Sequence, residues 1–401
     1  MSGPTAFVTH KRTRASSKRH PWVYSNSVTR VEGDYENGDA VIVRGPEGRF
    51  LAHAWINDAS KLRLRFVSYD RQAPIEPALL AERVRSAVAL RREVLRLPER
   101  ANAYRLIHSE GDGLPGLIVD LYGDVVVLTC SVLGLRRSLD VVLDALEEVL
   151  QPRAIVERDP GEGLREREGL PEPGGVLRGS LGDAEQVEIQ IDGMRFKVGV
   201  GVGEGQKTGL FLDQRDNVQT VASFAKGKRV LDACCYLGAF GLACAKAGAA
   251  AVHMFDTSAD AVAKTQAHAE LNGLSEGVTV QRGSLFRELT RLKQAEQSFD
   301  LIVLDPPKFA KKRSDLRKAR KGYLDANQLA LKLLAPGGIL LTCSCSGAFE
   351  MSDLEGVLRE SATRTGTNLR ILEQRGPGLD HPVDVHCPEG RYLKAILAQV
   401  R

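Results

Sequence analysis

Short apolar runs separated by turn signals make up the beginning of the chain. Asn37-Gly38 and Glu47-Gly48 are turn dipeptides, and the apolar runs at 40–43 and 61–67 lie beside them. Short strands joined by such turns are typical of a small β-barrel, which we expect over residues 1–75.

Helical spacing replaces this pattern after Glu76. Apolar residues recur at helical intervals as far as Leu97, and a strand-rich stretch follows from Tyr104 to Cys130. We therefore expect a mixed α/β central domain over residues 76–185. Its last part, 158–182, is rich in glycine, proline and charge, which predicts an exposed loop.

Buried strands and amphipathic helices alternate over the rest of the chain, which we expect to form a third domain, 186–401. Strands are expected at 229–232, 252–255, 278–281, 301–304, 339–343, 369–373 and 392–398. Helical patterns between the strands predict a parallel, doubly wound sheet. No helical pattern separates the last two strands, which predicts an antiparallel edge. The expected fold class is α/β, with a Rossmann-like, seven-stranded mixed sheet.

Composition agrees with several globular domains. The chain has 401 residues, of which 43% are hydrophobic and 26% charged. No apolar stretch is long enough for a signal peptide or a membrane span, so we expect no membrane partner. Seven cysteines without a repeating spacing indicate reduced thiols and a cytoplasmic protein. The oligomeric state stays open, a homodimer included.

A ligand site is predicted where the strands of the sheet end. Small residues after the first strand let the backbone approach a ligand, and the candidates there are Asp232, Ala233, Cys234, Tyr236 and Gly238. A dinucleotide would need the spacing Gly-x-Gly-x-x-Gly, of which only Gly238 and Gly241 are present. Phosphate binding is therefore weakly supported.

The next two strands add polar side chains to the same edge. Asp256, followed by Thr257, ends the second strand and could accept hydrogen bonds from ribose hydroxyls. Ser284 follows the third strand and could accept a hydrogen bond at the same edge. We include all three in the candidate ligand site.

Candidate catalytic residues follow the fourth and fifth strands. Asp305, Lys308 and the two prolines between them form a rigid turn that could present polar groups to a flat base. Cys345 lies just past the fifth strand, within reach of the same pocket, whereas Cys343 is expected to pack inside the protein. No cysteine or histidine pair has zinc-like spacing, so no metal is expected.

Together, Asp305 and Cys345 suit methylation of carbon 5 of cytosine. That carbon is a poor nucleophile until a thiolate adds to carbon 6, and a thiolate can leave again by elimination. Cys345 would attack, and Asp305 would hold the exocyclic amine and the protonated ring nitrogen. The residue that removes the proton from carbon 5 is not identified by the sequence.

Two basic clusters predict contact with RNA phosphates. The first precedes the aromatic residues Trp22 and Tyr24, and the second follows the Asp305 turn. The residues are Lys11, Arg12, Arg14, Lys18 and Arg19, then Lys311, Lys312, Arg313, Arg317, Lys318, Arg320 and Lys321. A base in structured RNA would have to be splayed out to reach Cys345.

Motifs along nearly the whole chain resemble the RlmI-like large-subunit (23S) rRNA cytosine-5 methyltransferases. The motifs are Arg19-His20-Pro21-Trp22-Val23, Gly111-Asp112-Gly113-Leu114-Pro115-Gly116-Leu117, Lys207-Thr208-Gly209, Leu212-Asp213-Gln214-Arg215, Asp305-Pro306-Pro307-Lys308-Phe309, Cys343-Ser344-Cys345-Ser346-Gly347, Asp380-His381-Pro382-Val383 and Pro388-Glu389-Gly390-Arg391-Tyr392-Leu393-Lys394. The resemblance implies a PUA domain, a central domain and a class I methyltransferase domain. It also implies S-adenosylmethionine as cofactor, and large-subunit rRNA or its assembly intermediate as substrate.

The resemblance assigns roles to individual residues. It implies that Cys345 is the nucleophile, that the cofactor pocket is lined by Asp232, Asp256 and Asp305, and that 213–215, with Gln214 and Arg215, lies over it. Two positions depart from relatives. Ser284 stands where relatives often have Asp, and Lys308 stands where many RNA cytosine-5 methyltransferases have a second cysteine.

Two other functions remain open on the sequence. An Asp-Pro-Pro turn also suits transfer to the exocyclic nitrogen of adenine or guanine, which needs no thiol. Alternatively, the chain is a non-catalytic RNA-binding protein that uses the PUA barrel and keeps the sheet as a scaffold.

Overall fold

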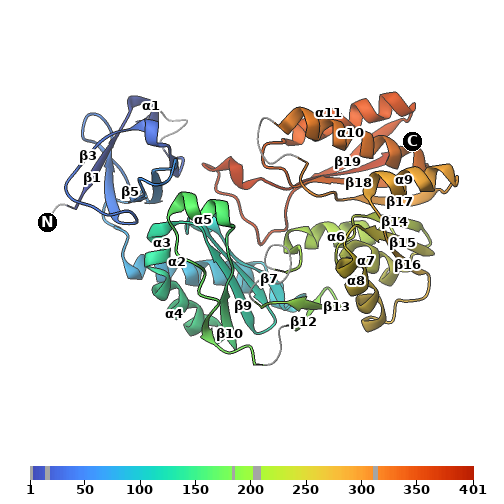
Figure 1. Cartoon of the computed structure of the whole chain (residues 1–401), viewed down its shortest axis with the longest axis horizontal. Coiled ribbons are helices and arrows are strands. Elements are labelled where there is room, and N and C mark those ends of the chain that lie inside the picture. The colour runs from blue at the N-terminus through green and yellow to red at the C-terminus, as the bar shows by residue number, and fades with distance from the viewer. Residues whose placement is uncertain (1–2, 14–18, 183–185, 202–208, 310–314) are drawn as a thin grey trace. The chain divides into compact units, whose positions relative to one another are not determined.

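The computed structural model describes residues 3–13, 19–182, 186–201, 209–309 and 315–401, which form two compact units (Figure 1). Unit 1 comprises Met1–Ile191, Lys197–Leu210 and Leu379–Gly390. Unit 2 comprises Asp192–Phe196, Phe211–Gly378 and Arg391–Arg401. The units do not coincide with single stretches of chain, and the domain limits at 75 and 185 stay predictions.

The first part of unit 1 is a six-stranded sheet in the order β2-β6-β5-β4-β1-β3. Its elements are β1 (Thr5–Val8), α1 (His10–Thr13), β2 (Trp22–Val23), η1 (Ser25–Ser27), β3 (Val28–Glu32), β4 (Ala40–Arg44), β5 (Phe50–Ile56) and β6 (Leu64–Ser68). Alternate apolar side chains such as Val8, Val43 and Ile56 form a fully buried core between these strands.

The second part of unit 1 is a five-stranded sheet in the order β11-β10-β9-β8-β7, with helices against it (Figure 1). Its elements are α2 (Pro77–Ala89), the π-helical turn η2 (Leu90–Val94), η3 (Leu97–Glu99), β7 (Ala103–His108), η4 (Ser109–Asp112), β8 (Leu117–Tyr122), β9 (Val125–Cys130), α3 (Leu133–Arg137), α4 (Leu139–Leu150), β10 (Ala154–Glu157), α5 (Glu162–Glu168) and β11 (Val176–Gly179). The mixed α/β pattern expected after Glu76 is therefore present.

The prediction of an exposed loop at 158–182 is wrong in part, because this segment contains α5 and β11. Glu168, at the end of α5, is 4% exposed. Its carboxylate accepts hydrogen bonds from Ser60 Oγ at 2.5 Å and Arg65 Nη2 at 3.2 Å. Tertiary contacts hold this charged helix in a segment whose composition favours a loop.

A buried charged network joins three segments of unit 1. The Arg91 guanidinium is fully buried and binds both Asp112 carboxylate oxygens, at 2.5 and 2.9 Å, and the Asp380 carbonyl at 2.6 Å. Gly111 is required beside it, because a Cβ there would collide with the Pro382 carbonyl. The network attaches Leu379–Gly390 to the central sheet.

Unit 2 contains a seven-stranded sheet in the order β16-β15-β14-β17-β18-β20-β19. The remaining elements of the chain are β12 (Gln186–Ile191), β13 (Met194–Gly199), η5 (Leu212–Gln214), α6 (Arg215–Ala222), β14 (Arg229–Ala233), α7 (Ala239–Lys246), β15 (Ala251–Asp256), α8 (Ala259–Leu271), β16 (Val278–Arg282), α9 (Leu285–Gln294), β17 (Phe299–Leu304), α10 (Leu316–Leu333), β18 (Leu334–Ser344), α11 (Met351–Thr365), β19 (Leu369–Arg375), η7 (Pro388–Gly390) and β20 (Lys394–Val400). Helices α9, α10 and α11 lie on one side of the sheet and α6, α7 and α8 on the other (Figure 1).

The strand directions place the candidate site. Strands β14 to β18 run parallel, so their carboxyl ends meet at one edge, whereas β20 runs antiparallel to both β18 and β19. This is the antiparallel edge that the sequence predicted. In the β17–β18 register Leu304 lies opposite Thr342, so Asp305 and Cys345 follow neighbouring strands at the same edge.

Replacing Arg91 by Met should destabilise unit 1 by about 3–5 kcal/mol, because it leaves the Asp112 carboxylate buried without its cation. Both tryptophans, Trp22 and Trp55, belong to unit 1, so urea unfolding followed by tryptophan fluorescence reports on this unit. Arg91→Met/Asp112→Asn should recover part of the loss. Equal stability of Arg91→Met and wild type would contradict the role assigned to the network.

Candidate active site

The loop after β14 surrounds a buried carboxyl group. Asp232 is 1% exposed, and its Oδ2 accepts a hydrogen bond at 2.9 Å from the amide of Gly241 in α7. A Cβ at Gly241 would collide with Met254, so only glycine lets this amide come so close. The turn between them passes through left-handed conformations at Cys234 and Tyr236, with φ of 64° and 50°.

The surroundings of Asp232 disfavour the ionised form of its carboxyl group. Burial raises its pKa to about 7, and the nearby carboxylates of Asp305 and Asp256 act in the same direction, against the stabilising Gly241 amide. A cation placed among these three carboxylates would favour their ionised forms. The edge is therefore chemically suited to a positively charged ligand.

Asp256 shapes the turn at the end of β15. Its Oδ2 accepts the Tyr236 amide at 3.0 Å and its Oδ1 accepts the Ser258 amide at 2.9 Å. The Tyr236 carbonyl accepts a hydrogen bond from Thr265 Oγ1 at 2.7 Å. The centre of the Tyr236 ring lies 4.7 Å from the centre of the Phe211 ring. The structure thus brings the predicted residues Asp232, Tyr236 and Asp256 together.

The outer part of the predicted ligand site is less tightly organised. The Thr257 carbonyl accepts a hydrogen bond from Arg282 Nε at 3.0 Å, and Ser284 directly precedes α9 without capping it through its side chain. Ala233 ends β14 inside the sheet, and Gly238 is the residue directly before α7. These residues lie at the ends of adjacent strands, as predicted.

A chain of polar side chains leads away from Asp305. Gln214 Nε2 donates to Asp305 Oδ2 at 2.9 Å, and Asn217 Nδ2 donates to Gln214 Oε1 at 2.6 Å. Arg375 Nε, from β19, donates to Asn217 Oδ1 at 2.7 Å. Sequence reasoning found Gln214 and Asp305 but missed Asn217, which lies in the first turn of α6. Arg215 is buried, and its Nε lies 3.4 Å from the Asp216 carboxylate.

Cys345 follows the last residue of β18 and is partly exposed, whereas Cys343 is fully buried, as predicted. All seven cysteines lie in the described part of the chain, and none forms a disulfide. Around Cys345, Ser344 Oγ donates to the Tyr323 hydroxyl at 2.9 Å, and that hydroxyl lies 3.2 Å from Ser346 Oγ.

Lys394 is a further polar residue beside Cys345 that the sequence reasoning missed. Its Nζ donates to the Ser346 carbonyl at 2.7 Å and to the Tyr392 carbonyl at 2.8 Å. A lysine within the apolar run of the last strand, between Leu393 and Ala395, was the available signal.

The basic residues of the first predicted cluster differ in exposure. Arg12 is 8% exposed, donates to the His20 carbonyl at 2.5 Å and lies over the Phe66 ring, which argues against an RNA contact. Lys11 and Arg19 are exposed, and Arg19 lies over the Tyr69 ring. Arg14 and Lys18 lie outside the described residues.

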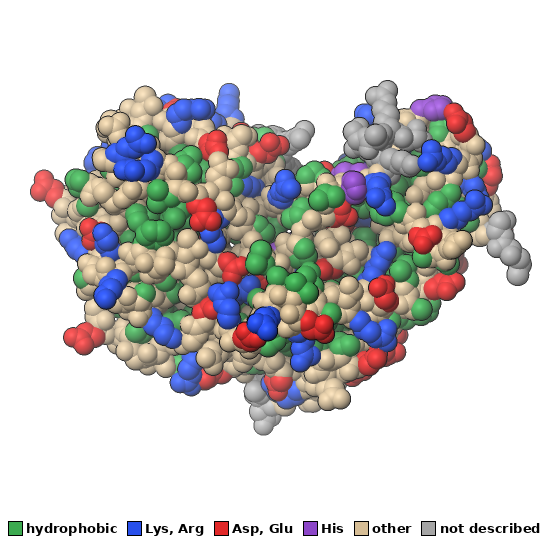
Figure 2. Space-filling view, turned by 180° about the vertical axis from the view of Figure 1, so that it is seen from behind, with side chains coloured by type: hydrophobic (Ala, Val, Ile, Leu, Met, Phe, Trp, Pro, Cys, Tyr) green, Lys and Arg blue, Asp and Glu red, His purple; other side chains and the backbone are tan. Residues whose placement is uncertain are grey.

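In the second cluster, α10 exposes Arg317, Lys318, Arg320 and Lys321. Arg320 also forms an ion pair with Glu360 at 2.7 Å. Lys311, Lys312 and Arg313 lie outside the described residues. On the face shown in Figure 2, the described Lys and Arg side chains are interspersed with Asp and Glu.

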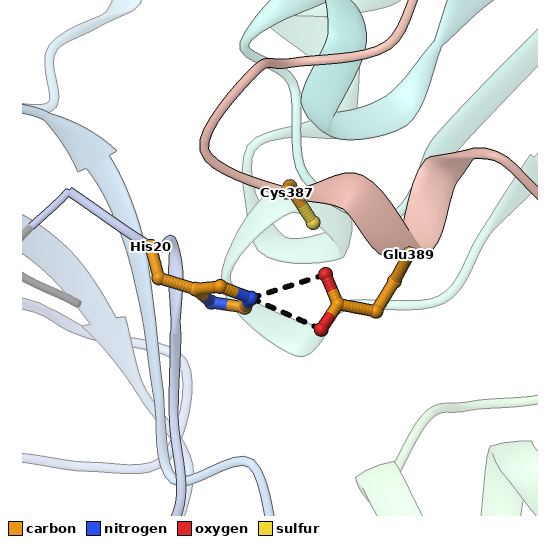
Figure 3. Close-up of side chains that lie close together, drawn as sticks. All are labelled: His20, Cys387 and Glu389. Atoms are coloured by element: carbon orange, nitrogen blue, oxygen red, sulfur yellow. Dashed lines mark hydrogen bonds and ion pairs between the residues drawn. The ribbon is translucent and has the colours of Figure 1, made fainter. Parts of the chain in front are cut away.

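One group of possible metal ligands lies in unit 1 (Figure 3). The ligand atoms of His20, Cys387 and Glu389 lie within 4.8 Å of one another. However, His20 Nδ1 accepts the Trp22 amide at 3.1 Å, so Nε2 carries the proton and donates to Glu389 Oε2 at 3.1 Å. A metal at Nε2 would require the opposite tautomer, so we describe this group as a hydrogen-bonded contact.

Replacing Asp232 by Asn should stabilise unit 2 in a pH-dependent way. The carboxyl pKa of about 7 in the folded chain exceeds its ordinary value of 3.8, so its contribution to stability is lost as pH rises from about 4 to 7. The advantage of Asn should grow across that range and reach at most about 4 kcal/mol above pH 7. Urea unfolding, followed by pulsed hydrogen exchange of the peptide that spans β14 to α7, measures the stability of both proteins. A stability difference between variant and wild type that does not change with pH would contradict the role given to the Asp232 pKa.

Comparison with known proteins agrees with this architecture. A family profile of S-adenosylmethionine-dependent methyltransferases matches residues 177–398, and one of PUA-like domains matches residues 7–69. SMU.776, a methyltransferase by its description and crystallised with SAH, has the same fold, with a TM-score of 0.84 at 20% identity over 100% of both chains. Among the described residues, no helix has the length and apolar character to cross a membrane.

Two curated relatives match nearly end to end. The ribosomal RNA large subunit methyltransferase I of Shewanella denitrificans is 38% identical over 97% of both chains. That of Aeromonas hydrophila is 37% identical over 98% of this chain and 99% of its own. The chain therefore belongs to the ribosomal RNA large subunit methyltransferase I family, S-adenosylmethionine-dependent enzymes in which a PUA-like domain precedes the methyltransferase domain.

Proposed function

We propose that this enzyme methylates carbon 5 of a cytosine in large-subunit (23S) ribosomal RNA through a covalent bond to Cys345. The observation that carries the proposal is the position of this partly exposed thiol, one strand from Asp305 at the carboxyl edge of the sheet. The names of the relatives support ribosomal RNA as the substrate. The alternative chemistry, methylation of a base nitrogen, gives no use to this thiol.

The proposed reaction begins at the Cys345 sulfur. The thiolate forms a bond to carbon 6, the ring electrons move toward carbon 5 and the ring nitrogen takes up a proton, with Asp305 holding that nitrogen and the exocyclic amine. Carbon 5 takes the methyl group and then loses its proton to a base. The electron pair released restores the double bond between carbons 5 and 6 and expels the thiolate, and the ring nitrogen gives back the proton that it took up.

The carboxyl edge fits S-adenosylmethionine, because Asp232 and Asp305 suit its sulfonium and ammonium cations. When bound, this cofactor supplies an electrophilic methyl group. We assign Asp256 to its ribose hydroxyls, since each carboxylate oxygen there accepts only one amide in the described contacts and can accept more. The remaining proposed contacts are Gln214, Arg215, Ala233, Cys234, Tyr236, Gly238, Thr257 and Ser284. We retain Lys308, which follows the two prolines, as a catalytic candidate.

Replacing Cys345 by Ala should lower formation of 5-methylcytidine at least about 1,000-fold, because the variant lacks the thiolate that attacks carbon 6. The assay transfers labelled methyl groups to protein-free large-subunit rRNA and identifies the nucleoside by mass spectrometry. Cys343→Ala is the matched control and should keep the product, since burial holds the pKa of that thiol well above its ordinary value. Methylated adenosine or guanosine, or an active Cys345→Ala enzyme, would favour nitrogen methylation instead.

We infer that RNA phosphates bind the exposed cations of α10, next to the Asp305 turn, and those of the PUA-like domain. Arg12 leaves this set because of its burial. The retained described residues are Lys11, Arg19, Arg317, Lys318, Arg320 and Lys321. The sequence adds Arg14, Lys18, Lys311, Lys312 and Arg313.

Charge reversal tests this surface. Lys318→Glu/Lys321→Glu should weaken RNA binding and reduce the slope of log affinity against log salt by about two, one for each lost phosphate contact. Lys332→Glu is the control, because this exposed lysine lies at the opposite end of the same helix. Equal losses from the control and the double variant would mean that general charge, and not this surface, sets the affinity.

A further inference from the structure

Lys394 places a buried ammonium group beside the proposed nucleophile. In the antiparallel β18–β20 pair it lies opposite Ser344, the residue before Cys345. Lys394 is 4% exposed, and its Nζ donates to the carbonyl of Ser346, the residue after Cys345. A second hydrogen bond, to the Tyr392 carbonyl, fixes the ammonium from its own strand. Lys394 therefore contacts the segment that carries Cys345.

Among the described residues, no carboxylate accepts a hydrogen bond from this ammonium. Buried charges are stable in proteins when they are paired. In the part of the chain that the structure describes, the hydrogen-bond partners of Lys394 Nζ are the two neutral carbonyls. Three nearby groups would favour the charged lysine when they are ionised. Cys345 has the largest effect, followed by Asp353 and Glu350.

We propose that Lys394 is a positioning residue of the active site, whose ammonium supplies the counter-charge for the Cys345 thiolate. This inference rests on the proposed function, in which Cys345 attacks the cytosine. The hydrogen bond to Ser346 holds the segment after β18 in place, and the positive charge lowers the free energy of the thiolate relative to the thiol.

Charged and titratable groups from several elements face this pair. Lys308, after β17, is a second cation near Lys394, and Glu350 and Asp353 lie before and within α11. Near Cys345, Tyr323 projects from α10 and Cys343 from β18. Burial lowers the pKa of Lys394 to about 8, so its charge, and with it the support for the thiolate, is lost as pH rises through that value.

The test measures alkylation of Cys345 by iodoacetamide in the full-length enzyme without RNA, from pH 6 to 10, with the modified peptide quantified by mass spectrometry. Lys394→Met removes the charge and keeps the chain length. We expect its alkylation rate at pH 7 to fall about tenfold or more, with wild-type and variant rates converging above about pH 9, where the free thiol ionises unaided. Lys394→Arg should restore part of the rate at pH 7.

Several outcomes would overturn the proposal. A folded Lys394→Met enzyme with the wild-type pH profile would do so. If that variant does not fold, the wild-type profile decides alone: half-maximal alkylation below about pH 8.5 supports a stabilised thiolate, and a midpoint at or above it refutes one. Alkylation needs no RNA, so the two proposals can fail separately. If no 5-methylcytidine forms but alkylation of Cys345 depends on Lys394, only the proposed function is refuted. If 5-methylcytidine forms but alkylation does not depend on Lys394, only the role of Lys394 is refuted.

Discussion

Burial of the Asp232 carboxyl group, with Asp305 and Asp256 nearby, is the constraint on which the edge of the sheet in unit 2 depends. Each carboxylate has at least one N–H donor: the Gly241 amide, the amides of Tyr236 and Ser258, and the Gln214 side chain. These donors require the left-handed turn after β14, a glycine in α7 and the approach of η5 to the end of β17. The local backbone follows from the need to give each of these carboxyl groups an N–H donor.

The parts of this site that could be predicted from the sequence share one property. Asp256, Asp305 and Cys345 lie at or directly after the ends of buried parallel strands, and an apolar run identifies such strands without knowledge of the rest of the fold. Helix α5 was missed because its charged sequence is stabilised by contacts of Glu168 with residues far away in the chain. Lys394 and Arg375 were missed for the same reason, since strand order brings them to the site.

Runs of positive charge were less informative than strand ends. A run records the residue types but not the direction of each side chain, and within the two clusters the directions differ. Arg12 packs over Phe66 inside its sheet, and Arg320 is paired with Glu360, whereas Lys318 and Lys321 are exposed. The exposure and ion pairing of each basic side chain depend on residues outside the run. A basic cluster therefore indicates a negatively charged partner but does not identify the residues that contact it.

The placement of Leu379–Gly390 in unit 1 affects how the chain is made. Arg105 in β7 donates its amide to the Asp380 carboxylate at 2.9 Å, and Arg91 donates to the Asp380 carbonyl. During synthesis from the N-terminus, the central sheet leaves the ribosome long before residue 380 has been added. Unit 1 must therefore wait for almost the entire polypeptide before its charged core is complete, and a nascent chain released early carries both arginines without this partner.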